Sequence, residues 1–120
     1  MSGVLELEEK YYVKLNRAKK IIDCMVSGTF VPEDAQSFVD DYHKAVNSIN
    51  PAEYTLEFDC TSMQVVSADM VPHLEACFGL YKESGFNKVI FKVQDNVVLK
   101  MQFNRLARNT GLTNVEVTSD

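Results

Sequence analysis

The pattern of hydrophobic and polar positions near the start of the chain is that of two β-strands. Residues 11–15 and 21–26 combine β-forming side chains with an alternation of apolar and polar positions, which is typical of half-buried strands. Only the short polar segment 16–20 separates them, and it is too short for a crossover helix. The two strands are therefore expected to pair as an antiparallel hairpin, with Gly28 ending the second one.

An apolar stripe with helical spacing follows the hairpin. Its members recur at intervals of three and four residues: Ala35, Phe38, Val39, Tyr42, Ala45, Val46 and Ile49. Pro32 suits the first turn of a helix, because its missing N–H would have no intrahelical partner there. Pro51, preceded by Asn50, stops the pattern. This stretch predicts an amphipathic helix with one buried face.

The middle of the chain predicts a strand, an exposed loop and a second helix. Residues 54–59 form a short apolar strand, and residues 60–69 form a polar loop. Proline is tolerated only near the start of a helix, so Pro72 places the helix N-cap near Asp69. Gly85 fits the left-handed residue that closes this helix. Functional sites in such sheets usually lie outside the carboxyl ends of the strands, which makes the loop the expected site.

The remaining residues predict a strand at 88–93, a helix at about 96–110 that closes on Gly111, and a weakly signalled last strand at 115–117. The expected fold is therefore a single α/β domain with the order β-β-α-β-α-β-α and helices mainly on one face of a mixed sheet. In the last helix, we assign Val98, Met101, Leu106 and Ala107 to the core. Val97, Leu99 and Phe103 are spread around this helix, which is either wedged between the sheet and the loops or presents these side chains as an apolar surface for self-association.

Composition narrows the function classes. The 120 residues carry a net charge of -5, which argues against a general nucleic-acid binder. The three cysteines lack any C-x-x-C spacing, so we expect reduced thiols in a cytoplasmic protein. Cys24 and Cys77 lie on apolar faces, and Cys60 follows a strand and is expected to react fastest. Residues 1–9 lack the features of a signal peptide, and no apolar segment is long enough to span a membrane.

The residues that carry chemistry are not arranged as an active site. To act as a nucleophile, Ser62 or Ser67 would need a histidine base. His73 lies over a helical turn away from Ser67, and no glycine elbow surrounds either serine. No paired ligands have zinc spacing, and no glycine-rich phosphate loop is present. Asp59 is expected to tie down its loop through N–H or hydroxyl groups. We therefore expect no enzymatic activity, metal or cofactor.

Several short segments resemble the motifs of one family in their order and spacing. They are an apolar strand end with glycine (Val26–Thr29), a strand ending in aspartate (Leu56–Asp59), an apolar pair heading a helix (Val65–Met70), a helix-ending glycine before a strand (Gly85–Val93), and a closing arginine, threonine, glycine and leucine (Arg108–Leu112). Together they resemble the STAS domain of sulphate-transporter tails and bacterial anti-sigma-factor antagonists. The resemblance covers nearly the whole chain and implies a regulatory, protein-binding domain.

The chain departs from that family at the position that the family phosphorylates. Counted without gaps, the family's aspartate falls on Ser67, its phosphorylated serine on Ala68, its second hydroxyl on Asp69 and its glycine on Met70. A phosphoserine switch needs a hydroxyl at the helix N-terminus, where a phosphate meets free N–H groups. Ala68 has none, so we expect no working switch unless the register slips to Ser67.

The leading hypothesis is a non-enzymatic module that binds another protein, of the anti-sigma or signalling-kinase kind, in a bacterium. The candidate contact residues lie in the loop and at the start of the second helix: Ser62, Ser67, Ala68, Asp69, Met70 and His73. Two alternatives stay open. One is a small ligand, nucleotide or lipid-like, in the crevice at the strand ends. The other is a homodimer formed through the last helix.

Overall fold

The computed structural model describes residues 10–119, so the expectation about a signal peptide, which concerns residues 1–9, lies outside the described residues. The expected order of elements is confirmed, including the last strand. The elements are β1 (Tyr11–Asn16), β2 (Ile21–Gly28), α1 (Pro32–Val46), the 3₁₀ turn η2 (Pro51–Glu53), β3 (Thr55–Met63), the 3₁₀ turn η3 (Ala68–Met70), α2 (Val71–Ser84), β4 (Lys88–Lys92), α3 (Val97–Thr110) and β5 (Val115–Thr118).

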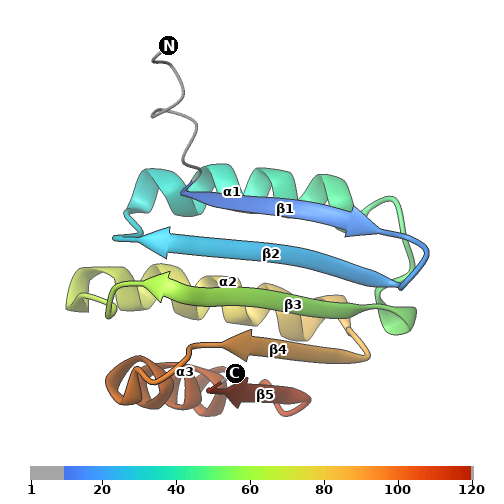
Figure 1. Ribbon diagram of the computed structural model, residues 1–120. Coiled ribbons are helices and arrows are strands. Elements are labelled where there is room, and N and C mark those ends of the chain that lie inside the picture. The colour runs from blue at the N-terminus through green and yellow to red at the C-terminus, as the bar shows by residue number, and fades with distance from the viewer. Residues whose placement is uncertain (1–9, 120) are drawn as a thin grey trace.

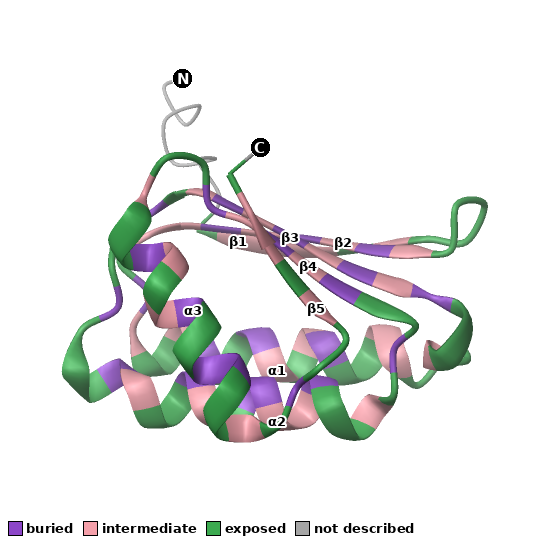
Figure 2. Ribbon diagram, turned by 90° about the horizontal axis from the view of Figure 1, so that it is seen from below, coloured by how far each residue is buried: buried purple, intermediate pink, exposed green. Residues whose placement is uncertain are grey.

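The five strands form one mixed sheet in the order β1-β2-β3-β4-β5 (Figure 1). β1 pairs with β2 as the predicted antiparallel hairpin, and the other three pairings are parallel. Figure 2 shows α1, α2 and α3 on the same side of the sheet. The predicted α/β class and the one-sided helix layer are therefore confirmed. The parallel strands β2, β3 and β4 end at one edge, from which α1 and α2 start.

Alternating residues of the central strands build the core between the sheet and the helices. The inward-facing side chains of β2, β3 and β4 are almost fully buried: Ile22, Cys24, Val26, Leu56, Phe58, Cys60, Val89 and Phe91. The Phe91 ring stacks on Phe58 at 4.9 Å and on Phe78 of α2 at 5.0 Å. Each such aromatic pair adds about 0.5–1.5 kcal/mol beyond its buried area. The stacked rings join the sheet to the helix layer.

Local signals place the C-terminal ends of α2 and α3 as predicted, but not that of α1. Gly85 and Gly111 adopt left-handed conformations with φ of 75° and 78°, as predicted for helix-closing residues. α1 begins at Pro32 as expected but ends at Val46, before the last member of its apolar stripe. The chain continues there in tighter turns, with the N–H of Ile49 donating to the carbonyl of Val46. Ile49 still packs against the core, so the stripe reports contact with the core and not helix length.

The predicted faces of α3 are partly wrong, although Leu106 and Ala107 are buried and Val97 is exposed as expected. Leu99 and Phe103, proposed as an exposed surface, are 0% and 3% exposed, whereas Val98 and Met101, assigned to the core, are 55% and 58% exposed. Leu99, Phe103 and Leu106 follow each other at spacings of four and three, which is one helical stripe. Two apolar stripes exist on this helix, and packing against Phe78 and Phe91 selects the one that contains Phe103.

Candidate functional site

β3 continues beyond the expected strand end. It runs to Met63, so Cys60, expected in an exposed loop, lies within the strand and is 2% exposed. Ser62 is also part of the strand, where it is exposed and pairs with Ser27 of β2. The loop proper therefore begins after Met63, and Ser62 belongs to the strand and not to the loop that leads into α2.

A β-bulge lets the strand continue. The register passes from Met25–Asp59 to Ser27–Ser62, so two residues of β3 lie opposite one residue of β2. Asp59 stabilises this irregularity, because its Oδ1 accepts hydrogen bonds from the backbone N–H of Thr61 at 3.1 Å and from the Thr61 hydroxyl at 2.7 Å. The predicted structural role of Asp59 is confirmed. Bulges redirect side chains near functional sites, and here Met63 is turned into the core.

The loop between β3 and α2 is held by a residue far away in the sequence. The backbone N–H of Val66 donates to Gln102 Oε1 at 2.9 Å, and Gln102 Nε2 donates to the Val66 carbonyl at 2.8 Å. The side chains of Val66 and Met70 are buried beneath the loop. Sequence reasoning missed Gln102, since a glutamine on a helix gives no signal for a partner 36 positions away.

The candidate contact residues divide into two groups. Ser67, Ala68, Asp69 and His73 are exposed and lie together where η3 leads into α2. Met70 was expected to contact a partner, but its side chain is only 3% exposed and serves as an anchor of the loop. We call the exposed group, Ser67 to Asp69 with His73, the loop surface.

The predicted role of Asp69 as the helix N-cap is wrong. α2 begins at Val71 and is preceded directly by η3, whose N-cap position is occupied by Ser67. Pro72 still lies in the first turn of α2, as predicted. The hydroxyl of Ser67 hydrogen-bonds the Asp69 carboxylate and, together with the backbone N–H of Asp69 and the nearby His73, lowers the pKa of Asp69 from its usual value. Asp69 is thus an exposed, fixed negative charge at neutral pH.

Two helix starts can be compared by mutation. Asn96 is a true N-cap, because its Oδ1 accepts from the N–H of Leu99 at 3.0 Å. Asn96→Ala should lower the free energy of unfolding by about 1 kcal/mol, whereas Asp69→Ala should change it much less, since no helix N–H depends on that carboxylate. Urea unfolding of both variants measures this. An equal loss in the two proteins would contradict the assignment of the caps.

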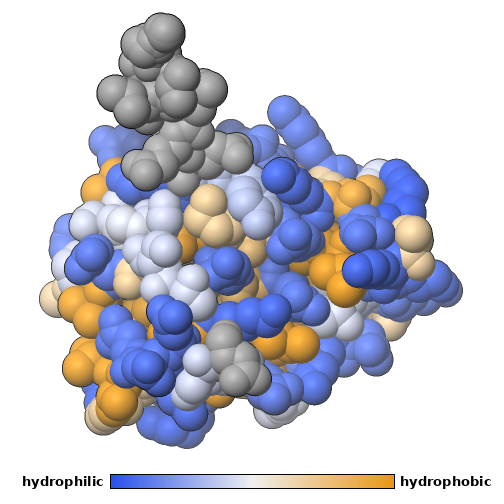
Figure 3. Space-filling model, in the orientation of Figure 1, coloured by the Kyte–Doolittle hydropathy of each residue, from blue (hydrophilic) through white to orange (hydrophobic). Residues whose placement is uncertain are grey.

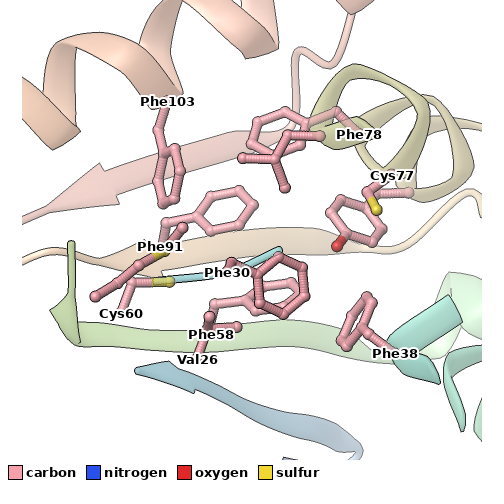
Figure 4. Close-up of a pocket in the computed structure, with 12 residues that line it drawn as sticks. Val26, Phe30, Phe38, Phe58, Cys60, Cys77, Phe78, Phe91 and Phe103 are labelled. Atoms are coloured by element: carbon pink, nitrogen blue, oxygen red, sulfur yellow. The ribbon is translucent and has the colours of Figure 1, made fainter. Parts of the chain in front are cut away.

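The crevice at the strand ends, which was considered as a site for a small ligand, is small, and so is the cavity in the core. The crevice beneath the loop, between Phe30 and Val66, has a volume of about 10 Å³. A cavity among the core aromatic rings, Cys60 and Cys77 has about 30 Å³ (Figure 4). One water needs roughly 10–15 Å³ on this measure, so neither space holds a nucleotide or a lipid chain. An open groove of about 360 Å³ lies between α1 and α2, with His43 and His73 among its lining residues.

The thiols are all inside the core. Cys24, Cys60 and Cys77 are free and buried, which contradicts the expectation that Cys60 is accessible. Burial raises the pKa of the Cys77 thiol to about 11, although a hydrogen bond with Tyr81 acts to lower this pKa. Burial also raises the pKa values of Cys24 and Cys60. These thiols are therefore protonated and shielded in the folded protein.

Within residues 10–119, no three histidine, cysteine or acidic side chains are grouped so as to hold a metal ion. No helix in the same residues has the length and apolar character needed to cross a bilayer.

Comparison with known proteins adds information on the fold. No model of a protein family matches the chain, and no curated protein matches its sequence. Among solved structures, the chain is similar to an uncharacterized protein of the DUF3478 family, with a SpoIIAA-like fold, from Shewanella loihica PV-4. The TM-score is 0.67 over 92% of this chain and 86% of the other, at 17% sequence identity. At this identity the likeness concerns the fold alone, and the chain has a SpoIIAA-like, STAS-like fold.

Proposed function

We propose that this protein is a non-enzymatic regulatory module of the STAS type, which binds another protein through the loop surface. The SpoIIAA-like fold supports an anti-sigma-antagonist-like module, and the loop surface lies at the carboxyl end of β3, where ligands of such sheets usually bind. The partner would be an anti-sigma factor or a signalling kinase of a bacterium.

The observation that carries this proposal is the double hydrogen bond between Gln102 and Val66. It satisfies both backbone groups of one loop residue, and the buried Met70 side chain anchors the loop at the start of α2. The loop is therefore presented in one conformation with Ser67, Ala68 and Asp69 exposed. A preorganised loop binds a partner at a lower entropic cost than a loop that must be ordered on binding.

The charge of the loop surface argues for constitutive binding without phosphorylation. Ala68, at the position that resembles the family's phosphoserine, has no hydroxyl. The neighbouring Ser67 hydroxyl helps to lower the pKa of the Asp69 carboxyl group, and a phosphate on Ser67 would be repelled by that carboxylate. In this proposal Asp69 supplies permanently the negative charge that a phosphate would supply on demand.

We expect Asp69→Lys to weaken partner binding by about tenfold or more, because it reverses a charge at the centre of the contact. Ser67→Ala and Ala68→Ser should change binding by less than about threefold, since both leave the Asp69 charge in place. The measurement is crosslinking and quantitative mass spectrometry in the native host, beside the free energy of unfolding of each variant. Glu83→Lys is the matched control, because it makes the same charge change at an exposed position near the other end of α2.

Two results would contradict the proposal. One is a large loss of binding for Ser67→Ala at unchanged stability. The other is phosphate on Ser67 in protein purified from the host. Either result would favour a phosphorylation switch with its register shifted by one residue.

A further inference from the structure

Four large hydrophobic side chains are exposed in the described part of the chain, and all lie on α3 or on the loop that α3 holds. Val97, Val98 and Met101 are 68%, 55% and 58% exposed, and Val65 is 48% exposed. Figure 3 shows hydrophobic surface at the lower left, over the position of α3 in Figure 1. Surface hydrophobic residues are ordinary when scattered, but a group of them marks an interaction surface.

These side chains belong to one surface. Met101 lies three residues after Val98 and four after Val97, so the three are neighbours on the helix. Val65 lies in the adjoining loop, where the next residue, Val66, is hydrogen-bonded to Gln102, the residue after Met101. We call Val65, Val97, Val98 and Met101 the apolar corner. Its three α3 residues form the apolar stripe that does not face the core.

Charged residues flank the apolar corner in a particular order. Asp95 precedes α3 and is exposed. Arg105 is also exposed and lies one helical turn after Met101 on the same side of the helix. Along α3 the order is therefore acidic, apolar and basic. A second α3 in the opposite direction has the complementary order.

We propose that a second copy of this chain covers the apolar corner, forming a symmetric dimer in which the two α3 helices pack antiparallel. With Val98 of each copy opposite Met101 of the other, Asp95 comes within about one residue's rise of the position opposite Arg105. The two-fold axis makes this pairing twice. Such a self-complementary contact is the form that symmetric dimers require, whereas an unrelated partner would not need acidic and basic groups at opposite ends of one patch.

Sedimentation equilibrium from about 1 µM to about 1 mM protein tests the dimer, since this range covers weak and moderate affinities. Val98→Glu and Met101→Glu should each raise the dimer dissociation constant by about tenfold or more, because each buries a charge in the contact. Gln36→Glu adds the same charge at an exposed position of α1 and should leave the constant unchanged. Circular dichroism must show that all three variants are folded.

Charge reversal tests the antiparallel arrangement. Asp95→Lys and Arg105→Glu alone should each weaken the dimer by about two- to fivefold, as expected for exposed ion pairs, and the double variant should recover most of the loss. A wild-type protein that stays monomeric at the highest concentration overturns the proposal, as does a dimer that Val98→Glu leaves intact. A double variant no tighter than the singles overturns the antiparallel pairing.

Discussion

Phe103→Glu is expected to unfold the protein. The Phe103 side chain is 3% exposed, and its ring lies 5.0 Å from Phe91 and 5.9 Å from Phe78. Removing a buried phenylalanine ring costs about 3–5 kcal/mol, and an unpaired carboxylate in the same place costs several more. Since domains of this kind are stable by only about 5–15 kcal/mol, little folded protein should remain.

Circular dichroism and urea unfolding measure the effect of this substitution. Val98→Glu is the matched control, because it adds the same charge to the same helix at a position that is 55% exposed, and it should remain cooperatively folded. Phe103→Leu, which keeps an apolar side chain, should be destabilised less than Phe103→Glu. If the urea midpoint of unfolding of Phe103→Glu equals that of the wild-type protein, Phe103 is not a core residue.

The second large effect concerns the thiols. In the native protein, Cys24, Cys60 and Cys77 should react with a thiol reagent at least about a thousandfold more slowly than in urea, since reaction requires unfolding. Their side chains are 0%, 2% and 2% exposed. The kinetics of Ellman's reagent measure this, and Ser67→Cys provides an exposed thiol as the reference. Fast native reaction of Cys60 alone would contradict the placement of that residue in β3.

The raised thiol pKa values also predict a pH dependence of stability. For Cys77 the folded pKa is about 11, against an ordinary value of 9.0, so the unfolded chain loses the thiol proton first as the pH rises. The stabilising contribution of the protonated thiol is complete below pH 9 and is lost as the pH rises to about 11. The free energy of unfolding should therefore fall across this window, and Cys77→Ala should reduce the fall.

The sequence by itself determined the order of elements, the hairpin and most element ends. These features depend on local physical chemistry, which acts within a few residues. Gly85 and Gly111 tolerate the left-handed conformation that closes a helix, and within a helix Pro32 is tolerated only in the first turn. The alternation in β2 sets which side chains face the core, whatever lies opposite them.

The tertiary structure decided the site. β3 continues beyond Asp59 because it pairs with β2 through a bulge. Asp69 is not the N-cap of α2, because η3 leads directly into that helix. Gln102 meets Val66 only when α3 packs beside the loop. α3 carries two apolar stripes, and packing against Phe78 and Phe91 determines which of them faces the core. Each of these outcomes depends on groups distant in sequence, whose contacts local propensity and periodicity do not encode.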